Sequence, residues 1–165
     1  MEGIFKLGDF KLHSEQVLAN AQLAYETHGS LNSEKSNVIL YPTWYSGRHD
    51  DNRGAIGSGK AMDPDKYFII VPDMFCNGLS SSPSNTLEPQ DGPRFPRINV
   101  YDNVIAQHKL LTNEFGIEKI KLVAGFSMSA QQAFHWGALY PHMVEAIAPI
   151  CGSAKTSRHN WLFLE

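Results

Sequence analysis

The sequence predicts an α/β fold, in which an antiparallel hairpin leads into a mostly parallel, doubly wound sheet. Three observations point to it. Short, almost continuous apolar runs recur along the chain, segments of helical periodicity separate the later runs, and the N-terminal region instead alternates apolar and polar positions. Parallel strands covered on both faces read as continuous apolar runs, whereas half-buried antiparallel strands alternate. Strands and helices that alternate with short links imply right-handed crossovers.

The hairpin is the first expected element. Apolar residues recur from Ile4 to Leu12 on either side of Gly8, and residues 17–27 mix apolar and polar positions. This pattern is typical of two half-buried antiparallel strands.

The parallel strands and their helices follow. The apolar runs that predict strands are residues 37–41, 67–71, 119–124 and 144–150. Apolar residues repeat at helical spacing over residues 100–115, and Gly116 follows where a helix C-cap would lie. A second helix is expected over residues 128–139, just before Tyr140-Pro141.

Two stretches, residues 43–59 and 74–98, are too long and irregular to be simple connections. Loops of this kind either carry function or lie disordered. The second contains Ser80-Ser-Ser-Pro-Ser84, and four of the five prolines from Pro72 to Pro96 lie within it. An extended, solvated loop is therefore at least as well supported there as a functional one.

The composition is that of an ordinary globular protein, with 42% hydrophobic and 19% charged residues. We expect residues 1–165 to form one domain. The net charge of −3 leaves no basic surplus for phosphates, so nucleic acid is not an expected partner. Cys76 and Cys151 lack metal-binding or disulfide spacing, and no metal site is predicted. Without a signal-peptide pattern or a membrane-length apolar run, we expect a cytoplasmic protein with no membrane partner.

The sharpest chemical motif is Gly125-Phe-Ser127-Met-Ser129, which joins an apolar strand directly to a helix. This order is typical of a nucleophile elbow. In an elbow, Ser127 is the nucleophile and the backbone N–H of Met128 helps to hold the oxyanion. A serine that merely caps the helix fits the five residues equally well. The place of the motif after the fifth strand-like segment favours the nucleophile.

Four stretches, spread over most of the chain, give it a resemblance to a known family. They are Ala24-Tyr-Glu-Thr-His-Gly29, Ile56-Gly-Ser-Gly-Lys-Ala-Met-Asp63, Tyr67-Phe-Ile-Ile-Val-Pro-Asp73, and Gly125 through Trp136 with Tyr140-Pro141. In this order they resemble the N-terminal half of the homoserine O-acetyltransferase family. These enzymes have the α/β-hydrolase fold and move an acyl group from coenzyme A to a hydroxyl. The resemblance implies that fold, truncated after about the sixth strand.

The same resemblance implies a reaction. Ser127 would carry the acyl group as an acyl-serine intermediate, with acetyl-CoA or another acyl-CoA as cosubstrate, a small hydroxyl compound as acceptor and no bound cofactor. The family's oxyanion loop corresponds by position to Tyr45-Ser46-Gly47. The N–H of Tyr45 is therefore the implied second oxyanion donor beside Met128.

Departures from the family pattern bear on the substrate. Arg48 stands where the family usually has aspartate, and Phe126, Ser129 and Ala130 replace glycines of the elbow. We expect Phe126 and the pair Trp44-Tyr45 to narrow the pocket entrance and make it apolar. A serine ester hydrolase is the alternative function, and a catalytically dead binding module is a second alternative.

Two weaker motifs are set aside. Gly54-Ala-Ile-Gly-Ser-Gly-Lys60 nearly spells a phosphate-binding loop, but Ala61 replaces the magnesium-holding Ser or Thr and no strand precedes the first glycine. His49-Asp50-Asp51 offers three adjacent candidate metal ligands, which rarely converge on one ion. We expect these three residues to be solvated loop charges.

The fold and the family both place the aspartate and histidine of the triad after the sixth strand. The chain ends at Glu165 before that point, and His135 and His142, which flank the elbow helix, are expected at its surface. Without a base, Ser127 is an ordinary alcohol. We therefore expect a fragment that is inactive or weak alone. Residues 144–150 would be an apolar edge strand, which favours a complementing C-terminal fragment or a homodimer as partner.

Overall fold

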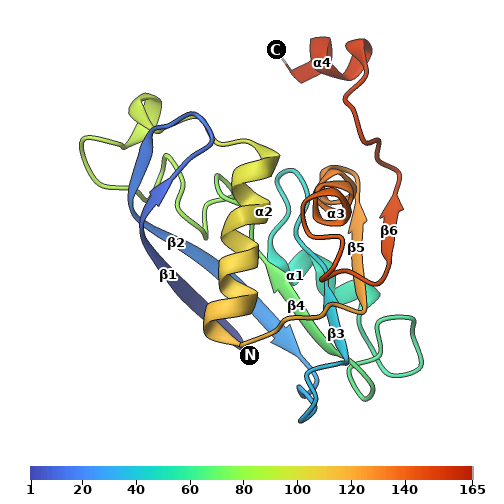
Figure 1. Cartoon of the computed structure of the whole chain (residues 1–165). Coiled ribbons are helices and arrows are strands. Elements are labelled where there is room, and N and C mark those ends of the chain that lie inside the picture. Colours follow the sequence, from blue (N-terminus) through green and yellow to red (C-terminus); the bar gives the residue numbers. More distant parts are fainter. Residues whose placement is uncertain (165) are drawn as a thin grey trace.

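A six-stranded sheet forms the centre of the computed structural model, which describes residues 1–164. The strands lie in the order β1-β2-β4-β3-β5-β6 (Figure 1). Their bounds are Glu2–Lys11 for β1, Val17–His28 for β2, Val38–Leu40 for β3, Phe68–Pro72 for β4, Leu122–Phe126 for β5 and Ile147–Ile150 for β6. This arrangement confirms the predicted α/β fold with its leading hairpin.

The pairing of the strands follows from their sequence patterns. The alternating strands β1 and β2 are antiparallel, with register shifts on both sides of Gly8, whose positive φ of 68° accommodates the irregularity. β2 also pairs with β4 in antiparallel fashion. The apolar strands β3, β4, β5 and β6 run parallel to one another. The sheet therefore changes from antiparallel to parallel at β4.

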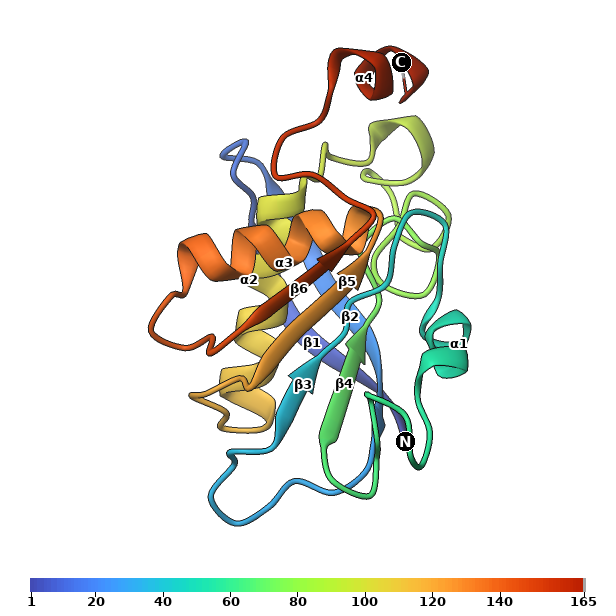
Figure 2. The same cartoon turned by 90° about the vertical axis from the view of Figure 1, so that its right-hand side faces the viewer.

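Helices cover one face of the sheet and loops cover most of the other. The helices are α1 (His49–Asn52), α2 (Val100–Lys109), α3 (Met128–Leu139) and α4 (Arg158–Leu164), and a π-helical turn, Leu110–Glu114, extends α2. Figure 2 shows α2 and α3 on one side of the sheet and α1 on the other. Within the described residues, we find no helix with the length and apolar character that crossing a membrane requires.

Two hydrophobic clusters follow the alternation of the strand side chains. The larger cluster joins Leu40, Ile70 and Val123 to the inner faces of α2 and α3, where Trp136 is fully buried. The smaller cluster joins Ile39, Val71 and other side chains of the opposite face to the loop that contains Trp44. Apolar side chains on both faces explain why the parallel strands read as continuous apolar runs.

The boundaries of α2 agree with the sequence signals. The Asn99 side chain accepts from the N–H of Asp102 at 2.9 Å, and the Asp102 carboxylate accepts from the N–H of Asn99 at 3.0 Å, which forms a capping box. Asp102 also accepts from the N–H of His13 at 2.7 Å and so connects the helix to the hairpin. Gly116 has a positive φ of 60° at the expected C-cap.

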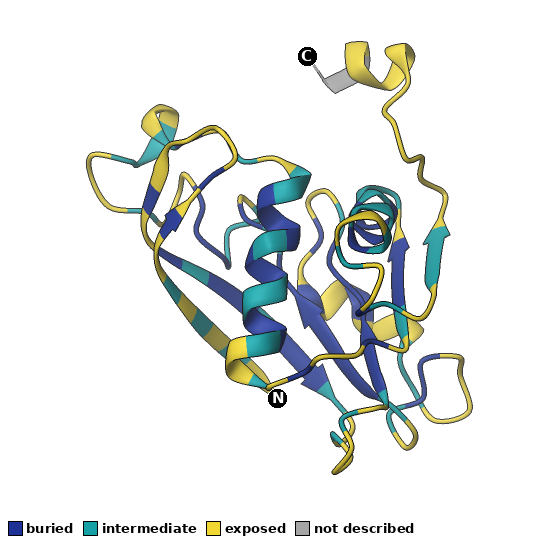
Figure 3. Ribbon diagram, viewed as in Figure 1, coloured by how far each residue is buried: buried dark blue, intermediate teal, exposed yellow. Residues whose placement is uncertain are grey.

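The expectation of a solvated loop over residues 74–98 is wrong for Ser80, Ser81 and Ser82, which are buried. The ribbon of this loop has both buried and exposed stretches in Figure 3. The Ser81 N–H donates to the carbonyl of Gln22 at 3.0 Å. The Ser80 hydroxyl accepts from the N–H of Ala24 at 2.9 Å and donates to the carbonyl of Asp73 at 2.8 Å. Ser80 and Ser81 thus satisfy backbone groups of β2, and the Ser82 hydroxyl donates to the carbonyl of Ser80 within the loop. Residues 83–85 and 87–89 of the same loop are exposed as expected.

The edge strand β6 offers few backbone donors. The carbonyls of Ala146 and Ile150 accept from N–H groups of Val123 and Ser127, on the β5 side. Because backbone groups alternate sides along a strand, those of Ile147 and Pro149 point to the open side. Proline has no N–H, so Ile147 supplies the one outward donor within β6.

Candidate active site

Ser127 lies at the tight junction between β5 and α3. Its backbone has φ 58° and ψ −120°, a combination that residues with a side chain rarely adopt. A Cβ atom at Gly125 would overlap the backbone carbonyl of Ser129, so only glycine lets the strand approach the first turn of the helix this closely. The junction therefore has the geometry expected of a nucleophile elbow.

The hydroxyl of Ser127 is not used to cap α3. The serine occupies the N-cap position, yet its side chain makes no capping hydrogen bond, and its backbone carbonyl accepts from the N–H of Ala130 at 3.0 Å. The helix-cap alternative raised by the sequence is therefore wrong. Instead the side chain borders a pocket of about 630 Å³.

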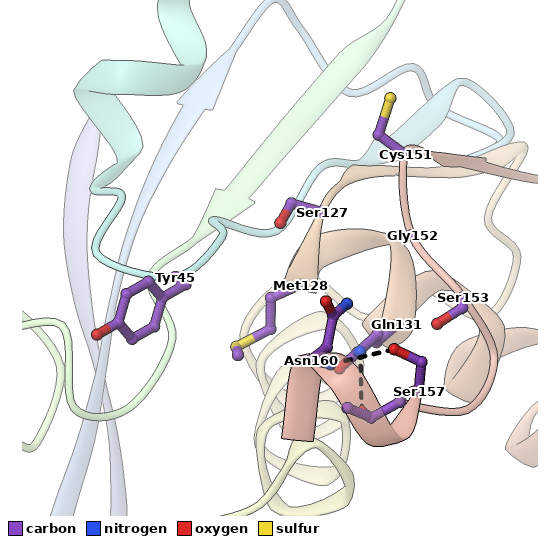
Figure 4. Close-up of a pocket in the computed structure, with 10 residues that line it drawn as sticks. Tyr45, Ser127, Met128, Gln131, Cys151, Gly152, Ser153, Ser157 and Asn160 are labelled. Carbon is purple, nitrogen blue, oxygen red and sulfur yellow. Dashed lines mark hydrogen bonds between the residues drawn. The ribbon is translucent and has the colours of Figure 1, made fainter. Parts of the chain in front are cut away.

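The three residues proposed from the sequence as site residues, Tyr45, Ser127 and Met128, all line this pocket (Figure 4). Tyr45 belongs to a turn in which the N–H of Gly47 donates to the carbonyl of Trp44 at 3.0 Å and Ser46 has a positive φ of 60°. Met128 is the first residue of α3, where backbone N–H groups lack helical partners. The structure thus brings both expected oxyanion donors to the pocket that Ser127 borders.

The other wall of the pocket comes from the chain after β6. A Cβ atom at Gly152 would lie 2.6 Å from the carbonyl oxygen of Ser127, so this segment passes directly over the elbow. The remaining lining residues are Gln131, Cys151, Ser153, Thr156, Ser157 and Asn160. No histidine lines this pocket within the described part of the chain.

The expected aromatic entrance forms only in part. Tyr45 lines the pocket with an exposed side chain, but Trp44 and Phe126 are not among its lining residues. Their rings instead meet edge to face, with centroids 6.2 Å apart. Phe126 is the last residue of β5, and alternation along the strand directs its side chain to the Trp44 side of the sheet.

The expectation of solvated loop charges is wrong for His49, although Asp50 and Asp51 are exposed. The Nδ1 atom of His49 lies 2.5 Å from Oδ2 of Asp73, and its backbone N–H donates to Oδ1 at 3.0 Å. Asp73 is completely buried immediately after β4. Sequence reasoning missed this pair because nothing in the loop pattern marks His49 as the partner of a residue beyond the next strand.

The charge of the His49–Asp73 pair is set by burial and by neighbouring acids. Burial alone would lower the pKa of His49, but Asp73, Glu26 and Glu2 outweigh it and raise that pKa. Burial raises the pKa of the Asp73 carboxyl, against the hydrogen bonds from His49 and Asn77. Arg53 pairs with both Glu26 and Glu2 beside this site.

The pair also shapes the loop that carries Tyr45. Oδ1 of Asp73 accepts from the Asn77 amide at 2.7 Å, and the same amide donates to the carbonyl of Gly47 at 3.1 Å. Asp73 and Asn77 therefore hold the far end of the turn. In the described residues, no three His, Cys, Asp or Glu side chains gather closely enough to hold a metal ion.

With the elbow and its pocket established, comparison with known proteins gives the family. A family model described as alpha/beta hydrolase fold matches residues 38–164. The chain belongs to the α/β-hydrolase family. Its matched region contains every parallel strand and the elbow, whereas the antiparallel hairpin lies outside it.

Individual relatives refine this assignment. The chain is 46% identical to an ethyl acetate hydrolase of Pseudomonas veronii over 98% of its own length and 47% of that protein. It superposes on the acetyl esterase MekB with a TM-score of 0.96 and 45% identity, over 99% of this chain and 48% of that one. A homoserine O-acetyltransferase of Chlorobaculum parvum is 42% identical over 90% of this chain and 43% of the transferase.

These comparisons correct the resemblance drawn from the sequence. The α/β-hydrolase family is confirmed, but this ethyl acetate hydrolase is more similar to the chain than this transferase. The motifs quoted from the sequence do not separate the two activities, because an elbow and an oxyanion loop serve ester hydrolysis and acyl transfer alike. The chain spans about half the length of the curated relatives it matches.

Proposed function

We propose that the protein containing this chain hydrolyses small acetyl esters, with Ser127 as the nucleophile. The observation that carries the proposal is the position of Ser127 at the border of the pocket that Tyr45 and Met128 also line. Its backbone is strained, and its hydroxyl does not cap α3. Similarity to an ethyl acetate hydrolase and to an acetyl esterase favours an acetyl ester as substrate.

The chemistry follows from this arrangement. The Ser127 oxygen attacks the ester carbonyl and gives its proton to a general base. Among the described residues that line the pocket, no histidine is present to act as that base. The N–H groups of Met128 and Tyr45 receive the oxyanion of the tetrahedral intermediate. The carbon–oxygen bond of the ester then breaks, the alcohol leaves with a proton, and water hydrolyses the acyl-serine to acetate.

Acyl transfer to a hydroxyl acceptor is the second candidate, favoured by the 42% identity to a homoserine O-acetyltransferase. Both reactions pass through the same acyl-serine and differ in whether water or an acceptor hydroxyl attacks it. The acceptor therefore provides the test that separates them.

The test measures acetate release from ethyl acetate and p-nitrophenyl acetate, and thiol release from acetyl-CoA with and without homoserine. We expect ester hydrolysis without an acceptor, and a loss of at least about 10³-fold in Ser127→Ala. Ser84→Ala, an exposed serine of the 74–98 loop, is the matched control and should retain activity. Thiol release that requires homoserine, without ester hydrolysis, would identify a transferase instead.

A further inference from the structure

Three consecutive backbone carbonyls after the end of β3 accept hydrogen bonds from side chains. We call residues 41–43 the strap. The Tyr41 carbonyl accepts from the Asn52 amide at 3.1 Å. The Pro42 carbonyl accepts from the Ser129 hydroxyl at 2.6 Å, and the Thr43 carbonyl accepts from the Gln132 amide at 2.9 Å. The strap leads directly into the turn that contains Tyr45.

The Gln132 amide is the end of a buried chain of hydrogen bonds. Its oxygen accepts from the Gln107 amide at 2.6 Å, and the Gln107 oxygen accepts from Nε1 of Trp136 at 2.9 Å. All three side chains are fully buried between α2 and α3. Each side-chain polar atom of Gln107, Gln132 and Trp136 thus has a hydrogen-bond partner, as a buried network requires.

The donors and acceptors of these hydrogen bonds can be arranged in only one direction. The indole N–H of Trp136 can only donate, so the oxygen of Gln107 faces it and the amide nitrogen of Gln107 faces Gln132. The oxygen of Gln132 must then face Gln107, which leaves its amide nitrogen for Thr43. The carbonyl of Thr43 can only accept. Rotating either glutamine amide by half a turn would place two donors or two acceptors against each other.

The same helix carries the other part of the oxyanion site. Met128 begins α3, and Gln132 lies one turn later, so the Met128 N–H and the donor to the strap belong to one rigid element. The strap cannot shift relative to α3 without breaking the bond between Gln132 and Thr43.

We propose that Gln132 is a positioning residue, which sets the distance between the Tyr45 and Met128 N–H groups through the carbonyl of Thr43. This inference rests on the proposed function for its catalytic meaning. A leucine in place of Gln132 would fill the same volume but would leave the Thr43 carbonyl and the Gln107 amide buried without partners, which destabilises the local structure.

The first measurement follows amide hydrogen exchange in this chain, independently of activity. In Gln132→Leu, we expect the amides of Thr43 and Gly47 to exchange about tenfold faster, relative to a variant of matched global stability such as Ile117→Val. The amide of Val123 in β5, which donates to Ala146, should stay within twofold of that control. Ile117 is buried in the larger hydrophobic cluster. Its backbone N–H donates to the carbonyl of Leu111, away from the strap.

Gln132→Glu provides the conservative rescue and a second variant if the leucine fails to fold. Burial raises the pKa of a carboxyl group, and the protonated form can again donate to Thr43. We expect protection of Thr43 and Gly47 to be reduced at alkaline pH and restored as the pH falls. The Ile117→Val variant should show no such pH-dependent recovery.

In the active enzyme, Gln132→Leu should lower kcat about 10- to 100-fold and leave KM within about threefold, because the displaced donor acts on the transition state. Equal exchange of Thr43 and Gly47 in Gln132→Leu and Ile117→Val would overturn the inference, and so would equal kcat values in these variants. If the wild type shows no esterase activity, the proposed function fails while the exchange measurement still decides the role of Gln132.

Discussion

Gly125 shows how one missing side chain sets the geometry of the elbow. The backbone of β5 lies against the first turn of α3 at this residue, and a Cβ atom would overlap the carbonyl and the hydroxyl of Ser129. The neighbouring Ser129 cannot move away freely, because its hydroxyl is bonded to Pro42. There is therefore no space for even one methyl group between β5 and the first turn of α3 at Gly125.

Gly125→Ala should destabilise the fold by about 1–3 kcal/mol, the usual range for overpacking a close-packed site. The measurement is the free energy of unfolding from urea titration. Gly54→Ala is the control, since nothing lies within 4 Å of a Cβ atom there, and its effect should stay within about 0.5 kcal/mol. Equal effects of the two substitutions would show that the close approach at Gly125 is relaxed in solution.

His49 gives the fold a dependence on pH. Its pKa is raised in the folded protein, by Asp73 with Glu26 and Glu2 against the effect of burial. Protonation of His49 therefore stabilises the folded state fully below the unfolded pKa of about 6.5, and this contribution is lost as the pH rises through the folded pKa.

The matching prediction compares wild type with His49→Gln by urea unfolding at pH 5.5 and pH 9. We expect the stability lost on substitution to be larger at pH 5.5, because the charged His49 is then present in the wild type. His142→Gln, at an exposed position after α3, is the control and should change the stability by no more than about 0.5 kcal/mol. A larger loss at pH 9 would contradict the sign of the pKa shift.

At the scale of elements, the loop of residues 74–98 acts as part of the sheet. Two of its buried serines, Ser80 and Ser81, bond to backbone groups of β2, where they take the place of a further strand. A polar, proline-rich sequence here is thus a packed element, because each hydroxyl finds a backbone partner.

Ser80→Ala should destabilise the protein by about 1–3 kcal/mol, since the N–H of Ala24 and the carbonyl of Asp73 both lose a buried partner. Thermal or urea unfolding measures the effect. Ser84→Ala is the matched control, because Ser84 is exposed in the same loop. If both variants unfold like the wild type, water replaces the Ser80 hydroxyl without loss.

The sequence predicted those helices and strands whose signals lie in contiguous residues. The helix expected between the elbow motif and Tyr140-Pro141 is α3, with the expected limits Met128–Leu139, and the apolar runs located β3 and β4 to within two residues. The runs at 119–124 and 144–150 begin three residues before β5 and β6 do, because their early residues meet only in the isolated bridge between Ile120 and Val144. At its other end β5 continues beyond the predicted run, to Phe126. Pairing, rather than propensity, decides where those strands begin.

The parts of the site that escaped prediction depend on partners far away in the sequence. His49 and Asp73 are 24 residues apart, and Gln132 and Thr43 are 89 residues apart. A glutamine in a helix reads as a surface residue until the fold shows what it contacts. The elbow was predictable because strand, turn and helix are contiguous there.

At the scale of the whole molecule, β6 is the edge of the described sheet, with one outward N–H, at Ile147. Edge strands invite pairing with other chains, and proline is one of the features that limit it. Pro149 therefore removes one donor from this edge, and the expectation that the edge draws a partner stays a prediction.

Pro149→Val would add an amide donor on the open side of β6. We expect the variant chain to self-associate at least several-fold more strongly than the wild type, as measured by sedimentation equilibrium over a range of concentrations. Pro141→Val, at an exposed turn after α3, adds the same group away from the edge and should leave association unchanged. Equal association of all three chains would mean that the β6 edge does not govern contacts between copies.

The strap of residues 41–43 has a consequence for how this site can diversify. Its contacts with Asn52, Ser129 and Gln132 all engage backbone carbonyls. They hold the loop without the side chain of Tyr45, which is exposed and lines the pocket. A mutational library at Tyr45 should therefore yield many folded proteins with altered substrate preference, because selection can change this side chain of the pocket wall while the backbone donor stays in place.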